Sequence, residues 1–196
     1  MILSSRFTEA LTYATELHAD QTRKGSGIPY ITHLLGVTSI ALEYGANEDE
    51  AIAALLHDAI EDQGGVATRD EIHRRFGETV TAIVEGCSDS SDGMPKLPWR
   101  QRKEAYIAHI PTASASVRLV SASDKLYNAR SIVRDYRRIG EEISNRFNGG
   151  KSGTLWYYRA ILEAFRQVEV TPVVSELDRV VQELEQLANE NSSSKQ

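Results

Sequence analysis

Cysteine, proline and long apolar runs are scarce in this sequence, and each shortage excludes a class of protein. The single cysteine, Cys87, has no second cysteine with which to form a disulfide inside the chain, which excludes a small disulfide-rich secreted scaffold. No apolar stretch approaches the roughly 20 residues that cross a bilayer. The first residues, 1–11, lack the basic start, apolar stretch and cleavage site of a signal peptide. We therefore expect a cytoplasmic protein that has no membrane partner.

Positive charge is also in short supply. The chain has 22 Lys and Arg against 28 Asp and Glu, a net charge of −6, and it contains no long basic run. Nucleic acid is therefore not an expected partner. An acidic protein that binds a polyanion needs a local cationic pocket or a metal ion, so residues that could hold a metal bear directly on function.

The remaining pattern is helical. Apolar residues recur at steps of three and four, and no segment alternates apolar and polar residues over the length of a strand. A chain of 196 residues suits one domain, which we place at residues 1–190, with a disordered polar tail at 191–196. We predict an all-α fold with loops at 21–29, 88–98 and 149–153. The expected helices are Ser5–Ala19, Tyr30–Gly45, Asn47–Asp62, Thr68–Gly77, Glu78–Gly86, Trp99–Ile110, Ala113–Ile139, Thr154–Val168 and Pro172–Asn189, with capping boxes at Asn47/Glu50 and Thr68/Glu71.

Segment 51–62, AIAALLHDAIED, combines a buried helix with titratable groups. Its histidine and three carboxylates are costly to place near a core unless something pairs with them. On one unbroken helix, His57 would lie above Glu61 and Asp58 above Asp62, because side chains four residues apart share a face. His57 and Asp58 could then reach one ion, with Glu61 and Asp62 beside it. The sequence predicts two metal ligands and two acid/base groups.

A divalent ion requires further ligands. His33, in a partly apolar helix upstream, is the best third ligand, although a hydrogen-bonded core histidine is the alternative. Asp124 is the best fourth ligand, because an isolated aspartate among apolar residues is destabilising without a cation. Its alternative is a pair with Lys125 or Arg130.

Three stretches strengthen this interpretation: HADQTRKGSGIPYITH at 18–33, LLHDAIED at 55–62 and SDKLYNAR at 123–130. With the order H…HD…D, they resemble the hydrolase domain of the RelA/SpoT family in the HD superfamily, including its single-domain small alarmone hydrolases. The resemblance extends from residue 18 to about 160. It implies an HD-domain bundle of about eight to ten helices and a manganese ion. It also implies hydrolysis of the 3′-pyrophosphate of (p)ppGpp to GDP or GTP plus pyrophosphate.

The resemblance also assigns roles to individual residues. It implies that the metal ligands are His33, His57, Asp58 and Asp124, and that the catalytic acids are Glu61 and Asp62. It places Arg23, Lys24 and Asn128 at nucleotide-contacting positions. Tyr127 is a candidate wall or stacking residue, for which core packing is equally plausible. Lys96 and Arg146 are candidates for contact with distal phosphates, for which a solvated surface is the more common role.

Two departures from the family pattern leave the substrate open. Leu34 follows His33 where the family usually has proline, and segment 86–110 differs from that of the bifunctional members. We expect no synthetase domain. The same site could act on another nucleotide: ppApp, the 2′-phosphate of NADPH or a nucleoside monophosphate.

Two further questions stay open. A His₂Asp₂ set also suits iron, cobalt or zinc. A function of another class, a non-catalytic alarmone-binding or toxin-neutralising partner, would not need Glu61 and Asp62. The oligomeric state is open, and a homo-oligomer is compatible with the sequence.

Overall fold

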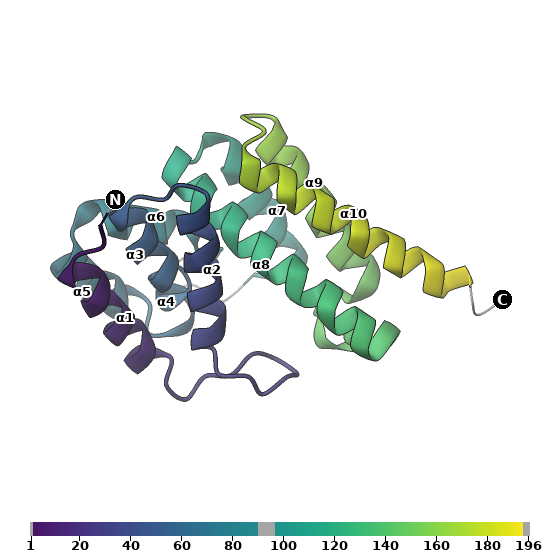
Figure 1. Cartoon of the computed structure of the whole chain (residues 1–196), viewed down its shortest axis with the longest axis horizontal. Helices are drawn as coiled ribbons and strands as arrows, with labels where there is room; N and C mark the ends of the chain where they lie inside the picture. The colour runs from purple at the N-terminus through teal and green to yellow at the C-terminus, as the bar shows by residue number, and fades with distance from the viewer. Residues whose placement is uncertain (1, 90–96, 194–196) are drawn as a thin grey trace. The chain divides into compact units, whose positions relative to one another are not determined.

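A computed structural model describes residues 2–89 and 97–193, and these are almost entirely helical (Figure 1). The all-α prediction is confirmed. In the described residues, the only strand-like pairing is a single bridge between Thr22 and Pro29. The helices are α1 Ser5–Leu17, α2 Ile31–Glu43, α3 Glu48–Leu56, α4 Ala59–Asp62, α5 Val66–Phe76, α6 Glu78–Cys87, α7 Trp99–His109, α8 Ala115–Ile139, α9 Gly150–Arg166 and α10 Pro172–Ser193, with 3₁₀ turns at Ile110–Thr112 and Gly140–Arg146.

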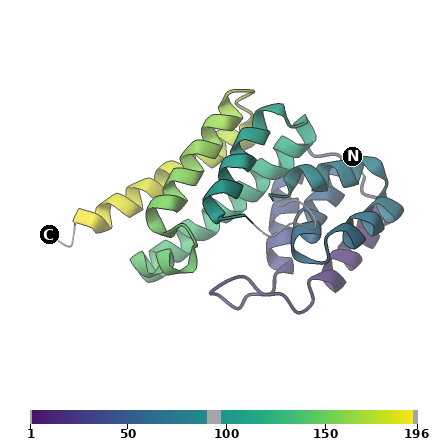
Figure 2. The same cartoon turned by 180° about the vertical axis from the view of Figure 1, so that it is seen from behind.

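The contacts divide the chain into two compact units. The first contains α1 to α6 and the start of α8 up to Ser123. The second contains α7, α8 from Asp124 onward, α9 and α10, and Figure 2 shows the same elements from behind. The single domain over 1–190 and the tail over 191–196 stay predictions, although α10 extends to Ser193. None of the helices within the described ranges has both the length and the apolar character needed to cross a bilayer.

Helix α3 lies at the centre of the first unit, where it packs against α1, α2 and α6. Every residue from 51 to 56 is buried, as the apolar run predicted. The predicted capping box also forms: the Glu50 amide donates to Asn47 Oδ1 at 3.0 Å, and the Asn47 amide donates to Glu50 Oε2 at 2.8 Å. The sequence thus sets both the start of this helix and the residues that it buries.

The prediction of one unbroken helix to Asp62 is wrong. α3 ends at Leu56 and α4 begins at Ala59, so His57 and Asp58 lie between the two helices. Asp58 has φ −96° and ψ −4°, outside regular α-helical geometry. His57 Nδ1 lies 2.8 Å from the carbonyl oxygen of Ala54, which in an unbroken helix would accept the amide of Asp58. The His57 side chain therefore competes with the Asp58 amide for the carbonyl oxygen of Ala54.

The capping box predicted at Thr68 and Glu71 is also wrong. α5 begins earlier, at Val66, and its N-cap is Gly65 with φ +60°. Thr68 is buried inside the helix, and its hydroxyl donates to the carbonyl oxygen of Gln63. The threonine thus secures the preceding turn instead of beginning the helix.

The loop predicted at 149–153 is mostly helix, because α9 begins at Gly150. The glycines there provide room for a ring. A Cβ on Gly149 would lie 2.6 Å from Cη2 of Trp99, and one on Gly153 would lie 3.3 Å from the same atom. In the second unit, α9 also packs against α7 and α10. The glycines of this segment allow close packing of the Trp99 ring and do not mark a loop.

Gly86 provides a test of packing in the first unit. A Cβ at this position would lie 2.6 Å from Cγ2 of the buried Val117. Without that contact, Gly→Ala in a helix would stabilise the protein by up to about 1 kcal/mol. We expect Gly86→Ala instead to lower the free energy of unfolding by about 1–3 kcal/mol, measured by denaturant titration with circular dichroism. Adding Val117→Ala should make the double variant more stable than the sum of the two single effects; strict additivity would contradict the contact.

Candidate metal centre

Three side chains of the first unit converge in its interior. His33 comes from α2, and His57 and Asp58 come from the break between α3 and α4. The Nε2 atoms of the two histidines lie 3.3 Å apart. Asp58 Oδ2 lies 3.2 Å from Nε2 of His33 and 3.1 Å from Nε2 of His57. The histidines are only 1% and 3% exposed. Among the described residues, these three form the group that could hold a metal ion.

The hydrogen bonding of His57 selects the form that binds a cation. A carbonyl oxygen only accepts, so the 2.8 Å contact with Ala54 places the proton of the neutral ring on Nδ1. The lone pair on Nε2 then faces His33 and Asp58. Two imidazole nitrogens and a carboxylate oxygen suit a borderline divalent ion such as manganese, iron, cobalt or zinc. The residues present therefore fit a metal site.

Tyr30 orients the carboxylate ligand. Its hydroxyl donates to Asp58 Oδ2 at 2.6 Å, and its ring stacks on that of the buried His18, with centroids 5.2 Å apart. Burial and the adjacent Asp58 raise the pKa of the Tyr30 phenol far above its ordinary value, so the hydroxyl stays protonated and keeps donating. Burial by itself would raise the pKa of Asp58, but His57 and His33 outweigh it and hold that pKa well below the usual range. Asp58 is therefore ionised and fixed in position.

The two predicted acids follow on α4. Glu61 is half-buried and Asp62 is exposed. The Asp62 amide donates to the Asp58 carbonyl oxygen at 2.9 Å, so the expected four-residue relation survives the helix break. Gln21 Nε2 donates to Asp62 Oδ2 at 2.8 Å. The acids thus lie one turn from the ligand pair, and one of them is held from outside the helix.

Sequence reasoning missed the roles of Gln21 and Tyr30. Gln21 Oε1 is 2.6 Å from His18 Nδ1 and accepts from Gln63 Nε2 at 2.6 Å. The only signal available was spacing: Gln21 follows His18 by three residues, and Tyr30 precedes His33 by three. His18 is confirmed as a packed histidine near the site.

Between these residues, the predicted loop forms a closed hairpin. The Arg23 amide donates to Ile28 O at 2.8 Å and the Tyr30 amide to Gln21 O at 2.9 Å. Gly25 and Gly27, with φ of +75° and +68°, make the turn, which explains the glycines. The Arg23 guanidinium lies 5.8 Å from the centroid of the Tyr30 ring. The structure thus brings Arg23 to the metal centre, whereas Lys24 is exposed.

Asp124 belongs to the second unit and is buried. It accepts from Asn128 Nδ2 at 2.6 Å and from Lys125 Nζ, which is the pairing considered as its alternative role. Burial by itself would lower the pKa of the Lys125 amine, but Asp124 outweighs it and raises that pKa well above the ordinary value. Asp124 is not in the group formed by His33, His57 and Asp58. Its role as the fourth ligand stays a prediction.

The other predicted contact residues are less informative. Tyr127 and Asn128 are half-buried on α8. Arg146 forms an ion pair with Asp135 at 3.0 Å. Lys96 lies outside the described residues. The nucleotide contacts of all four stay predictions.

Comparison with known proteins identifies relatives of this site and fold. The family model for the HD domain matches residues 10–149. The guanosine-3′,5′-bis(diphosphate) 3′-pyrophosphohydrolase MESH1 of Xenopus tropicalis is 41% identical over 129 residues, covering 64% of this chain and 69% of the relative. The bifunctional (p)ppGpp synthase/hydrolase SpoT of Escherichia coli K12 is 35% identical over 133 residues, covering 65% of this chain and 18% of SpoT.

A solved structure shares the fold. It is described as a metazoan orthologue of SpoT that hydrolyses ppGpp, and it matches with a TM-score of 0.76 at 22% sequence identity. The match covers 93% of this chain and 97% of the other. The predicted helical bundle is therefore confirmed as the fold of this solved structure.

The hydrogen bond from Tyr30 predicts an effect on metal binding. Tyr30→Phe keeps the ring stacked on His18 but removes the donor to Asp58, so the affinity for manganese should fall by roughly 10- to 100-fold. Competition with a fluorescent chelator would measure it. Tyr44→Phe, at the far end of α2, is the matched control and should keep the wild-type affinity. Equal affinities for both variants would show that Tyr30 does not support the ligand.

Proposed function

The chain belongs to the HD domain family, and from this premise we propose that it hydrolyses (p)ppGpp to GDP or GTP plus pyrophosphate. The observation that carries the proposal is the convergence of two buried histidines, His33 and His57, with the half-buried Asp58. Glu61 and Asp62 follow these ligands by one helical turn. Two relatives, which align with this chain over 69% and 72% of their own length, are named as hydrolases of this nucleotide. A binding protein would need the nucleotide contacts but not the acids.

We propose manganese as the ion and Asp124 as the fourth ligand. A bound divalent ion would lower the pKa of a water and polarise the phosphoryl oxygen under attack. The chain supplies the rest. His57 offers a lone pair oriented by Ala54, and Asp58 offers a carboxylate oxygen that the Tyr30 hydroxyl holds in place.

Glu61 and Asp62 are the proposed acid/base pair. As carboxylates beside the ligands, they can orient the attacking water, accept its proton and return a proton to the leaving oxygen. Gln21 uses its amide N–H to hold one oxygen of Asp62, which leaves the other oxygen available for the reaction. Gln21 is thus a positioning residue.

The hairpin at 21–30 is the proposed nucleotide contact. Arg23 presents a planar guanidinium that can stack on a purine or bind a phosphate in two places, and Lys24 adds an exposed point charge. Asn128, Tyr127, Arg146 and Lys96 complete the proposed set. A cytoplasmic location fits the single cysteine and this intracellular class of substrate.

Product analysis tests the reaction directly. Purified protein incubated with ppGpp and manganese should release GDP and pyrophosphate, and removal of divalent ions with a chelator should stop the reaction. Glu61→Gln with Asp62→Asn should lower kcat by at least about 100-fold while manganese still binds. Parallel incubations with ppApp and NADPH identify the preferred substrate. Turnover of ppGpp that survives in the double variant would contradict the assignment of the acids.

Gln21 predicts a separate effect on kcat. Gln21→Ala frees Asp62 from its donor, so kcat should fall roughly 10- to 100-fold, with KM and manganese content unchanged. Gln21→Glu places a like charge beside Asp62 and should be at least as damaging. Gln182→Ala, at an exposed position of α10, is the matched control. A fall in manganese content with kcat would show that Gln21 supports the fold or the ligands instead.

A further inference from the structure

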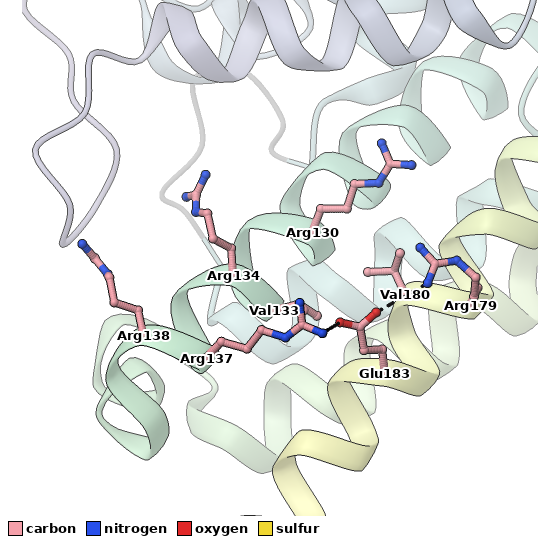
Figure 3. A pocket seen from close by; sticks show the side chains of 8 residues that line it. All are labelled: Arg130, Val133, Arg134, Arg137, Arg138, Arg179, Val180 and Glu183. Carbon is pink, nitrogen blue, oxygen red and sulfur yellow. Dashed lines mark hydrogen bonds and ion pairs between the residues drawn. The ribbon is translucent and has the colours of Figure 1, made fainter.

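A second concave site lies wholly within the second unit, on α8 and α10 (Figure 3). The pocket has a volume of about 500 Å³ and contains none of the residues of the metal centre. Pockets of this size commonly accommodate a small molecule. Its walls are unusually rich in one residue type. The lining residues are Arg130, Val133, Arg134, Arg137, Arg138, Arg179, Val180 and Glu183.

Carboxylates neutralise only part of this arginine cluster. Arg137 forms an ion pair with Glu183 at 2.8 Å. Arg130 and Arg179 share Glu176, at 3.0 and 2.8 Å. Three guanidinium groups therefore meet two carboxylates, and they are anchored where α8 and α10 face each other (Figure 3).

Arg134 and Arg138 supply the surplus charge. They lie four residues apart on α8, so their like charges share one face and repel each other. Both are exposed. Arg134 contacts Asp135 at 3.3 Å, but that carboxylate also pairs with Arg146. Arg138 makes no ion pair with any residue in the described ranges. An anion bound between them would relieve this repulsion.

The setting favours a compact anion over an extended one. The chain as a whole carries a net charge of −6, which repels a long polyanion such as nucleic acid. Guanidinium groups bind phosphate oxygens in pairs, with a geometry that matches the fork of the side chain. Several phosphates in one small molecule could engage several of these arginines at once.

We propose that this arginine pocket is a second ligand site, which binds a compact polyphosphate, either free or carried by a nucleoside. Its lining residues include none of those proposed for the metal centre, so the two sites can be tested separately. The site therefore remains available whether or not the proposed hydrolysis of (p)ppGpp is correct.

Binding measurements on the full-length protein test the proposal. Isothermal titration with inorganic triphosphate should show binding to the wild type that weakens at least tenfold in the double variant Arg134→Gln/Arg138→Gln. Neither residue has a buried partner, so the fold should be kept, which circular dichroism checks. The matched control is Arg159→Gln/Arg166→Gln, two exposed arginines on α9 outside the pocket, which should bind triphosphate like the wild type.

Parallel arms identify the ligand and separate the two sites. Tighter binding of GTP than of triphosphate would identify a nucleotide as the ligand, and equal binding would identify the phosphate chain itself; both support the site. The proposal is overturned if the wild type does not bind either probe, or if both double variants bind alike. It is also overturned if a single-stranded oligonucleotide binds more tightly than either probe. A raised KM for ppGpp in the pocket variant would likewise overturn it, by making the pocket part of the substrate site.

Discussion

The arrangement of the first unit depends on two imidazole nitrogens and one carboxylate oxygen that face one another. The Nε2 atoms of His33 and His57 and one oxygen of Asp58 all lie within 3.3 Å of each other. Lone pairs at this separation repel unless a proton or a cation lies among them. The local structure serves this convergence: α3 breaks so that two consecutive residues can turn inward, and Ala54 and Tyr30 fix the orientation of the side chains.

Local chemistry explains why part of this was predictable from the sequence. Every residue of the run at 51–56 is apolar, so its burial could be predicted from the sequence. The capping box beside it could also be predicted, because its two residues are only three apart. The break at His57 and Asp58 was not predictable, because helical spacing gives no information about a side chain that competes for a backbone acceptor. Thr68 fits a capping pattern, yet its hydroxyl bonds to a carbonyl instead.

Long-range contacts marked the limit of prediction at the site. Gln21 and Asp62 are 41 residues apart, and no periodicity relates them. The glycines near 150 resemble a turn in the sequence, because nothing there shows the ring of Trp99 packed on them. The family model ends at residue 149, whereas the structural match covers 93% of the chain, so similarity of fold extends beyond recognisable similarity of sequence. Helix α10 lies beyond the family model, and the arginine pocket combines it with residues of α8 that lie within the model.

The base and the tip of the hairpin at 21–30 have different contacts. Its base carries Gln21 and Tyr30, which are joined by a main-chain hydrogen bond and hold an acid and a metal ligand respectively. Its tip, around Ser26 and Ile28, makes neither contact. Mutation at the tip can therefore alter what the loop touches while the base keeps the reactive groups aligned. A lineage that carries this hairpin has a route to new substrates that does not put the chemistry at risk.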